Sequence, residues 1–346
     1  MQDQRHLWAD LAKGLSIILV VYGHATVGVV KDVPMEGWLF DTLMKPISQF
    51  RMPLFFFVAG IFAHFSIRRE WPRFIDRTIL HLVYVFVVWN LLQYGARMAF
   101  AAYANTPIEP FRILFFWIHP INITWFIWAL IVFYLICRAW RSLPLAPLVA
   151  VAAVLAAAPI EGLTYAIQQG SAFFLYFVLG LALSDQMRAF DREVRGVWVL
   201  SAIVAYTVAA LIVVHLGLLA VPVIELATRL AGIAMVLTVC MWLAQNGRCG
   251  WLAVLGRHTL PIFVTHTLVT AGLREIVLRT GMSDGALVLI LVAWAGGVVL
   301  PLMFDRIMRR LGLPWLFERP AWFSLASVDR AGAVLRRPAA SAAGRA

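Results

Sequence analysis

Apolar segments of about 20 residues, the length that crosses a bilayer as one helix, recur along almost the whole chain and limit its possible folds. The composition agrees, because 62% of the 346 residues are hydrophobic and only 14% are charged. We therefore predict an all-α fold, a polytopic transmembrane helix bundle. The predicted spans are 11–30, 46–66, 76–103, 123–141, 145–160, 165–184, 195–217, 223–246, 258–278 and 285–309.

The distribution of arginine predicts the orientation of this bundle. Arginines cluster in alternate loops, for example at 68–77 and 188–195, and the intervening loops carry few. Cytoplasmic loops are enriched in Lys and Arg, so the alternation predicts about ten spans with both termini in the cytoplasm. Segment 145–160 is short and has Pro147 and Pro159 near its ends. We keep it as a span because the arginines at 188–195 would otherwise change sides.

Two regions fall outside the predicted spans. Residues 104–122 hold an apolar patch that is too short to span and is interrupted by prolines, which suits a re-entrant or interfacial segment on the outer side of the membrane. Residues 311–346 become rich in Ala, Arg and Pro and cannot bury a core. We therefore predict an integral membrane domain at 1–310 and a basic, disordered cytoplasmic tail at 311–346.

Charge and cysteine content argue against two other kinds of function. The formal net charge is +11, but the basic residues sit in short loops between apolar segments, where topology explains them without a nucleic-acid partner. Cys137, Cys240 and Cys249 have neither metal-ligand spacing nor the even count of a disulfide framework. We expect membrane lipid as a partner, no nucleic acid and no bound metal.

The first span carries two basic residues inside an apolar helix, Lys13 and His24. They are eleven residues apart, so they lie on nearly the same face and are separated by a rise of about 16 Å. Asp10 lies one turn before Lys13 and can pair with it. An ionisable side chain within a span costs about 2.5–3.5 kcal/mol on insertion scales and so indicates a functional site. A structural histidine and a lysine anchor at the membrane surface are the alternative interpretations.

Further polar residues fall at a similar depth in other spans. The second span runs back from the outer side, which puts Arg51 level with His24, so the two could face each other. A buried arginine needs a specific partner. The outer half or the middle of the bilayer is also predicted to hold Asn90, Arg97, Gln168, Glu225, Arg229 and His266. This polarity predicts a polar cavity, whereas Gly60 indicates close helix packing.

Several segments make the chain resemble the acyltransferase 3 family, the membrane-bound O-acyltransferases that decorate bacterial surface glycans. Asp10, Lys13 and His24 are similar to the family's first-helix motif, with Lys in place of the commoner Arg. The fucose-type sugar O-acetylases are the subset that the chain resembles in length and opening residues. The other similar segments are FRMPLFFFVAGIF (50–62), TWFIWALIVFYLI (124–136), FFLYFVLGLAL (173–183) and LGRHTLPIFVTH (255–266).

The resemblance implies an acetyl-CoA-dependent O-acetyltransferase of the bacterial cytoplasmic (inner) membrane, with acyl-CoA as co-substrate. An acyl group, usually acetyl, would move from cytoplasmic acyl-CoA to a hydroxyl of a cell-surface or lipid-linked glycan. We expect Lys13, held by Asp10, to bind CoA, and Arg51 to stabilise charge on the thioester oxygen. His24 would act as general base or accept the acyl group transiently, and either role needs a neutral imidazole. We assign substrate binding to Trp125, Gln168, Arg229 and His266.

A transporter or flippase for a sugar or an anionic lipid-linked substrate is the alternative, because such proteins also hold a polar cavity at membrane depth. Paired, interrupted helices in two repeated halves would indicate a transporter, and the sequence shows no such repeat. The acyltransferase is therefore the favoured interpretation. The acceptor glycan and the length of the acyl chain stay open.

Overall fold

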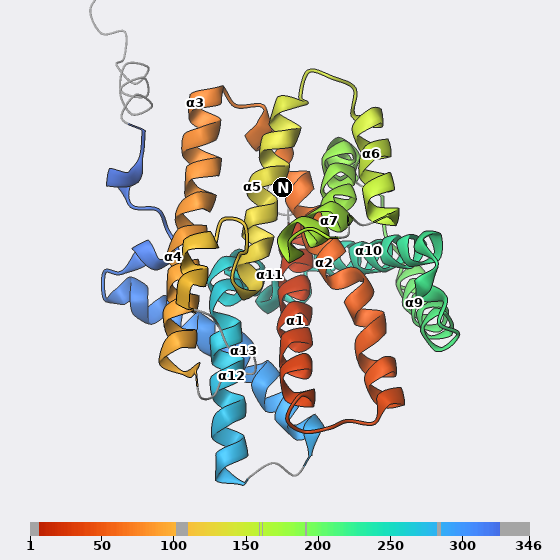
Figure 1. The fold of residues 1–346 in the computed structure, drawn as a ribbon. Coiled ribbons are helices and arrows are strands. Elements are labelled where there is room, and N and C mark those ends of the chain that lie inside the picture. Colours follow the sequence, from red (N-terminus) through yellow and green to blue (C-terminus); the bar gives the residue numbers. More distant parts are fainter. Residues whose placement is uncertain are drawn as a thin grey trace, which may run out of the picture.

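The computed structural model describes residues 7–101, 110–158, 160, 162–190, 192–281 and 285–325 (Figure 1). These residues form helices and no strand, which confirms the all-α prediction. The α-helices are α1 Leu7–Val30, α2 Gly37–Ile67, α3 Trp71–Phe74, α4 Leu80–Ala99, α5 Trp125–Ala139, α6 Leu145–Ala157, α7 Tyr165–Ala182, α8 Ser184–Ala189, α9 Gly196–His215, α10 Pro222–Gln245, α11 Gly250–Arg257, α12 Thr259–Thr280 and α13 Ala286–Arg310.

Eight helical segments of the described chain are long and apolar enough to cross a membrane. One of them runs without interruption from Trp71 to Ala99, through α3, the π-helical turn η2 (Ile75–Ile79) and α4. The two remaining predicted spans correspond to the shorter apolar helices α5 and α6, of 15 and 13 residues. Each predicted span therefore contains a helix. The count of ten spans and the cytoplasmic position of the termini stay predictions.

Helix α1 lies inside the bundle, in contact with α2, α10, α11, α12 and α13. Its closest neighbour is α11, and two glycines allow their backbones to meet. A Cβ atom on Gly14 would lie 2.0 Å from the carbonyl oxygen of Leu252, and one on Gly256 would lie 1.9 Å from that of Asp10. Small residues at such crossings let membrane helices pack closely. This packing fixes the N-terminal half of α1, which carries Asp10 and Lys13.

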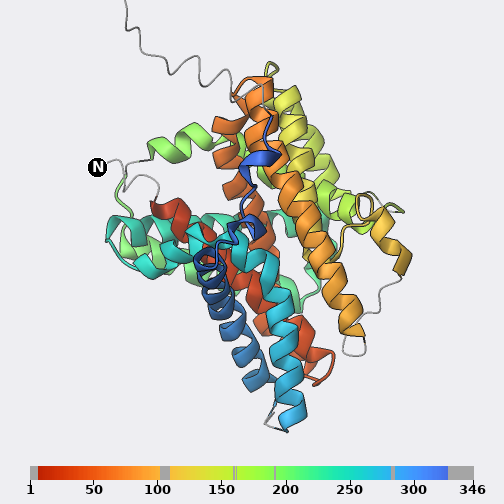
Figure 2. The same cartoon turned by 90° about the vertical axis from the view of Figure 1, so that its left-hand side faces the viewer.

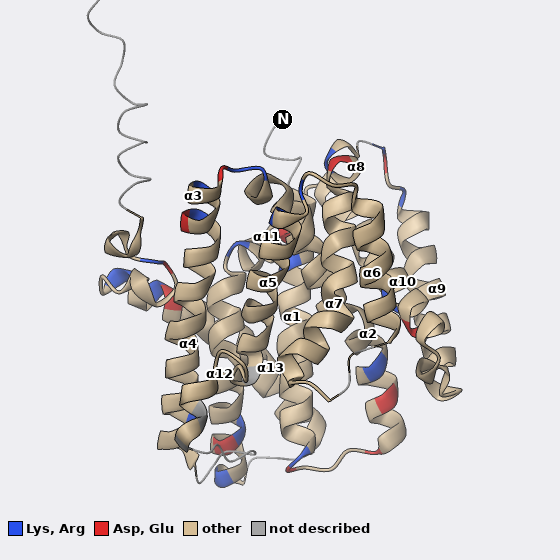
Figure 3. Ribbon diagram, turned by 45° about the horizontal axis from the view of Figure 1, so that its top comes forward, with Lys and Arg blue, Asp and Glu red and all other residues tan. Residues whose placement is uncertain are grey.

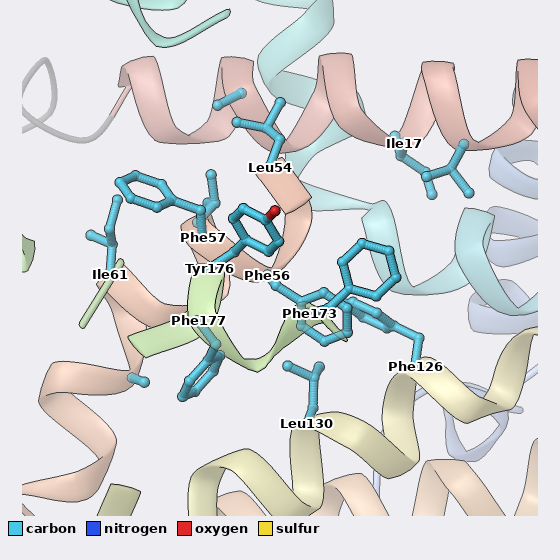
Figure 4. Packing of buried hydrophobic residues seen from close by; sticks show 14 of the residues in the cluster. Ile17, Leu54, Phe56, Phe57, Ile61, Phe126, Leu130, Phe173, Tyr176 and Phe177 are labelled. Atoms are coloured by element: carbon cyan, nitrogen blue, oxygen red, sulfur yellow. The ribbon is translucent and has the colours of Figure 1, made fainter. Parts of the chain in front are cut away.

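An aromatic core joins α2, α5 and α7 (Figure 4). The ring of Phe56 on α2 contacts Phe126 on α5 and stacks on Phe173 of α7, with centroids 4.6 Å and 5.7 Å away. The helices also meet at Gly60 and Gly180, where an added Cβ would lie 2.1 Å from Phe177 O and 2.0 Å from Phe57 O respectively. The predicted packing role of Gly60 is confirmed. This rigid wall supports the segment of α2 that carries Arg51.

Part of the segment assigned to the tail packs against the bundle. In this C-terminal segment, Leu316 and Phe317 are buried, and the carbonyl of Leu316 accepts a hydrogen bond from Trp89 Nε1 at 2.8 Å. Arg319 forms an ion pair with Asp76, 2.8 Å apart. The start of α1 and the short helix η8 (Ala321–Phe323) both lie in the upper half of the molecule as drawn in Figure 1 and Figure 2. Residues 326–346 lie outside the described residues.

Only part of the predicted interfacial segment 104–122 is described. The turn η4 (Pro110–Phe115) exposes Phe111, and Trp117 beyond it is also exposed. The buried Asn90 of α4 ties down the end of the segment, since its Oδ1 accepts hydrogen bonds from Ile121 N and Thr124 Oγ1, both 2.9 Å away. Asn90 therefore has a structural role. Placement of the segment at the membrane surface stays a prediction.

Candidate active site

Asp10, Lys13 and His24 follow one face of α1, which we call the first-helix stripe. Its N-terminal end holds an ion pair. Lys13 Nζ lies 2.7 Å from Asp10 Oδ1, as the i, i+3 spacing predicts, and 4.8 Å from the centroid of the Phe62 ring. Arg257, on α11, lies 3.8 Å from the other oxygen of Asp10. The tight α1–α11 crossing thus brings a second basic residue to Lys13. Its place beside Lys13 could not be found from the sequence, because α11 is 240 residues away along the chain.

The guanidinium of Arg51 lies against the backbone of α1 one residue before His24. An ideal Cβ on Gly23 would fall 1.1 Å from Arg51 Nη1, so only glycine leaves room for this side chain. Nη1 is buried and has no hydrogen-bond partner among the residues that the structure describes. Arg51 is close enough to interact electrostatically with both His24 and His266. An unpaired, buried guanidinium nitrogen is costly unless it serves a ligand.

His24 contacts a second histidine, His266 of α12. Their ring centroids are 5.1 Å apart. His266 is fully buried, and its Nδ1 lies 2.7 Å from Phe263 O and 3.1 Å from Ile262 O. A carbonyl oxygen can only accept a hydrogen bond, so Nδ1 carries the proton and, in the neutral ring, Nε2 keeps a lone pair. Within the described part of the chain, that Nε2 atom has no hydrogen-bond partner.

A pocket of about 800 Å³ begins at His24 and is walled by α1, α4 and α12. Gln93 of α4 also lines it. Its Nε2 donates hydrogen bonds to Val264 O (2.9 Å) and Thr267 Oγ1 (3.2 Å), whereas its buried Oε1 has no partner among the described residues. Gly23 and His24 point about 100° apart on the helix. Arg51 and the pocket therefore reach the start of the site from different sides.

The structure brings some of the predicted site residues together and leaves others apart. His24, Arg51 and His266 converge, while Asp10 and Lys13 form the ion pair at the other end of α1. The remaining three have other surroundings: Trp125 stacks on Phe173 in the aromatic core, Arg229 pairs with Glu225, and Gln168 is half-buried on α7. Among the predicted site residues that the structure describes, His24 alone lines the pocket itself. The role of Trp125, Gln168 and Arg229 in substrate binding stays a prediction.

The described residues contain no group of three or more His, Cys, Asp or Glu side chains able to hold a metal ion. The pocket wall instead offers the imidazole of His24 and the amide of Gln93, and the imidazole of His266 and the guanidinium of Arg51 adjoin His24 from outside the wall. This set can move a proton and stabilise an oxyanion. Fold and site define a polytopic membrane protein with a buried histidine–arginine centre at the end of a deep pocket.

Comparison with a protein-family model shows which family the chain belongs to. The acyltransferase 3 model, described as an acyltransferase domain, matches residues 6–305. The chain belongs to this family. The resemblance drawn from the first-helix motif is therefore confirmed, and the chain is a membrane protein of the acyltransferase class.

Two curated relatives match parts of the chain. It is 26% identical to the inner membrane protein YcfT of Escherichia coli (strain K12) over 185 residues, 45% of this chain and 49% of that protein. It is 28% identical to the nodulation protein NolL of Sinorhizobium fredii (strain NBRC 101917 / NGR234) over 141 residues, 40% of this chain and 38% of NolL. The chain thus spans half or less of the length of these relatives. No solved structure matches it.

Proposed function

We propose that this protein transfers an acyl group, acetyl in the simplest case, from cytoplasmic acyl-CoA to a hydroxyl of a cell-surface or lipid-linked glycan. The observation that carries the proposal is the contact of His266 with His24, a residue of the pocket wall, beside a buried nitrogen of Arg51 that has no hydrogen-bond partner among the described residues. Acyl transfer to a hydroxyl needs a base and a donor for the developing oxyanion. Membership of the acyltransferase 3 family supports the same reaction class.

His24 is the proposed general base, since it lines the pocket where an acceptor hydroxyl can reach it. The hydroxyl oxygen attacks the thioester carbonyl carbon while His24 removes its proton. A C–O bond forms, the C–S bond breaks, and His24 returns the proton to the departing CoA sulfur. Arg51 donates hydrogen bonds to the carbonyl oxygen, whose negative charge grows during the attack.

His266 is the proposed positioning residue. Its two backbone carbonyl partners fix the proton on Nδ1, so Nε2 can accept a hydrogen bond from a ring nitrogen of His24. The other ring nitrogen of His24 then keeps its lone pair for the hydroxyl. A base held by a third group is the usual arrangement in acyl transfer. We prefer this role to direct substrate contact, because His266 is fully buried behind His24.

Lys13 and Arg257 are the proposed contacts of the phosphates of CoA. Lys13 lies near the start of α1, about 16 Å of helix rise from His24, and Arg257 of α11 approaches the same carboxylate, Asp10. CoA carries its phosphates and its thioester at opposite ends of a long arm, so the two ends of the stripe suit the two ends of this molecule. The proposed location is the bacterial inner membrane, and the similarity to YcfT, an inner membrane protein, supports it.

The test uses the full chain in lipid nanodiscs, with [¹⁴C]acetyl-CoA as donor and, as acceptor, envelope glycans extracted from source cells lacking the gene. We expect label to enter glycan, with NMR showing O-acetyl signals. His24→Ala should lower the rate by 10²-fold or more. His215→Ala, at the far end of α9, is the matched control. A folded His24→Ala protein that transfers label at the wild-type rate would overturn the proposal.

The transporter alternative is not favoured by the family assignment. The same preparation also tests it, because a transporter would move a sugar without cleaving a thioester. Release of CoA thiol that depends on both His24 and glycan supports acyl transfer. Sugar uptake into vesicles without any thiol release would support the alternative.

A further inference from the structure

Beyond His24, the pocket extends to the end of the bundle opposite the start of α1. Its outer part is lined by residues of the C-terminal ends of α1, α4 and α12. Four of them are basic, Lys31, Arg97, Arg274 and Arg279, and one is acidic, Glu275. Figure 3 shows charged residues gathered at the C-terminal end of α12, at the bottom of the view. The rest of the wall is mostly apolar, as at Val27 and Phe100.

The basic residues of the outer pocket are held in place by the fold. Arg274, only 6% exposed, has its Nε 3.0 Å from Asp32 Oδ2 and donates a hydrogen bond from Nη1 to Gly28 O at 3.4 Å. Arg279 pairs with Glu275 at 2.7 Å. Leaving Arg97 aside, three positive side chains, Lys31, Arg274 and Arg279, stand against two negative ones, Asp32 and Glu275, so these described groups sum to a net positive charge. A surplus of charge beside apolar walls concentrates its field in the cavity.

Lys31 differs from the lysine outside the pocket, because it forms no ion pair with a described residue. Elsewhere at the same end of the bundle, Lys45 is 2.9 Å from Asp41 and the pair is neutral. The positive-inside rule also disfavours arginine on the outer side, where the predicted topology puts this pocket. The predicted topology therefore does not explain the charge, whereas binding of an anion would explain it.

We propose that the acceptor of the acyl group is anionic and carries a phosphate or carboxylate that binds in the outer pocket, near Lys31, Arg274 and Arg279. This inference rests on the proposed function, because it takes His24 as the site of transfer. Lys31 follows His24 by seven residues, so the anion lies about 10 Å along α1 from the reacting hydroxyl. The charged group and the acylated hydroxyl therefore belong to different units of the acceptor. The two sources of such an anion are a uronate within a free glycan and the diphosphate of a lipid-linked one.

The experiment measures binding and acetyl transfer with three probes and the full chain in neutral phosphatidylcholine nanodiscs. The probes are maltotriose, a trisaccharide of the same length ending in glucuronate, and maltose linked to farnesyl diphosphate. We expect at least one charged probe to bind tenfold or more tightly than maltotriose. Raising the salt concentration should weaken that preference, since ions screen exposed charges. The charged probe that binds more tightly identifies the source of the anion.

Variants test the residues directly. Lys31→Gln and Arg279→Gln should each weaken binding of the charged probe several-fold and leave maltotriose unchanged. Glu275→Gln should strengthen it, because a negative side chain leaves the wall. Lys45→Gln removes a lysine at the same end but outside the pocket and should change nothing. Equal binding of maltotriose and both charged probes, or charged-probe binding unaffected by the pocket variants, would overturn the inference.

The two proposals fail in different ways. If His24-dependent acetyl transfer occurs equally with charged and neutral acceptors, the anion site is wrong and the transfer mechanism stands. If the charged probes bind selectively but no acceptor receives label, the transfer proposal is wrong. Binding measured on His24→Ala protein separates the readouts, because that variant lacks the proposed base and retains every basic residue of the outer pocket.

Discussion

The guanidinium of Arg51 occupies the space that a side chain on Gly23 would fill, with Nη1 only 1.1 Å from the position of an added Cβ. This contact sets an arginine from α2 beside His24 of α1. A first prediction follows from it. Gly23→Ala should displace the guanidinium, which is the far end of a flexible side chain, without preventing folding. We expect acyl transfer to fall by about 10²-fold, the effect of losing one oxyanion donor.

Gly95→Ala on α4 is the control for that change, because an added Cβ there meets no atom within 4 Å. The radiolabel transfer assay measures both variants, and thermal unfolding in detergent checks the fold. Wild-type transfer by a well-folded Gly23→Ala protein would mean that Arg51 does not act where this structure puts it.

The second prediction concerns the lone pair of His266. His266→Asn can keep a donor to the carbonyls of Ile262 and Phe263 but loses the acceptor at Nε2. We expect kcat to fall by at least about tenfold with KM for the acceptor unchanged, as when the group that orients a base is lost. His266→Gln, whose amide oxygen reaches further, should recover part of the rate. A change confined to KM, or equal loss in both variants, would argue against positioning of His24.

A third prediction separates binding of CoA from anchoring by Lys13. Lys13→Ala should raise KM for acyl-CoA by about tenfold or more, since a hydrogen bond to a charged group contributes about 1.5–3 kcal/mol. Lys13→Arg keeps the charge and should stay close to wild type. Initial rates at varied acetyl-CoA give both values. Unchanged saturation in the alanine variant would leave Lys13 as an anchor paired with Asp10.

The fourth prediction is about stability at the α2–α7 crossing. A Cβ on Gly180 would lie 2.0 Å from the backbone oxygen of Phe57, and backbone cannot move aside as a side chain can. Gly180→Ala should therefore destabilise the bundle by about 1–3 kcal/mol, the usual effect of overpacking. Gly170→Ala on the same helix meets its nearest atom at 3.6 Å and should be tolerated. Unfolding temperatures in one detergent compare the two, and equal values would show that α7 can shift.

Local patterns along the chain were enough to predict the helices. Every predicted span contains a helix because apolar length is a property of contiguous residues. The pairing of Asp10 with Lys13 was predictable for the same reason, since three residues along a helix fix a distance. The depth argument also set Arg51 level with His24. It could not show that Gly23 is what lets Arg51 approach, because the glycine's value depends on what lies opposite it.

The sequence by itself therefore determined the class of fold, the family and the stripe on the first helix. Only the tertiary structure decided which polar residues meet. It joined His266 to His24, left Trp125, Gln168 and Arg229 outside the pocket wall, and turned Asn90 into a structural tie. It also gathered the basic residues of α1, α4 and α12 around one pocket. The physical reason is that hydropathy and helical spacing fix depth and face within each helix, whereas side-chain and backbone packing fix which faces meet.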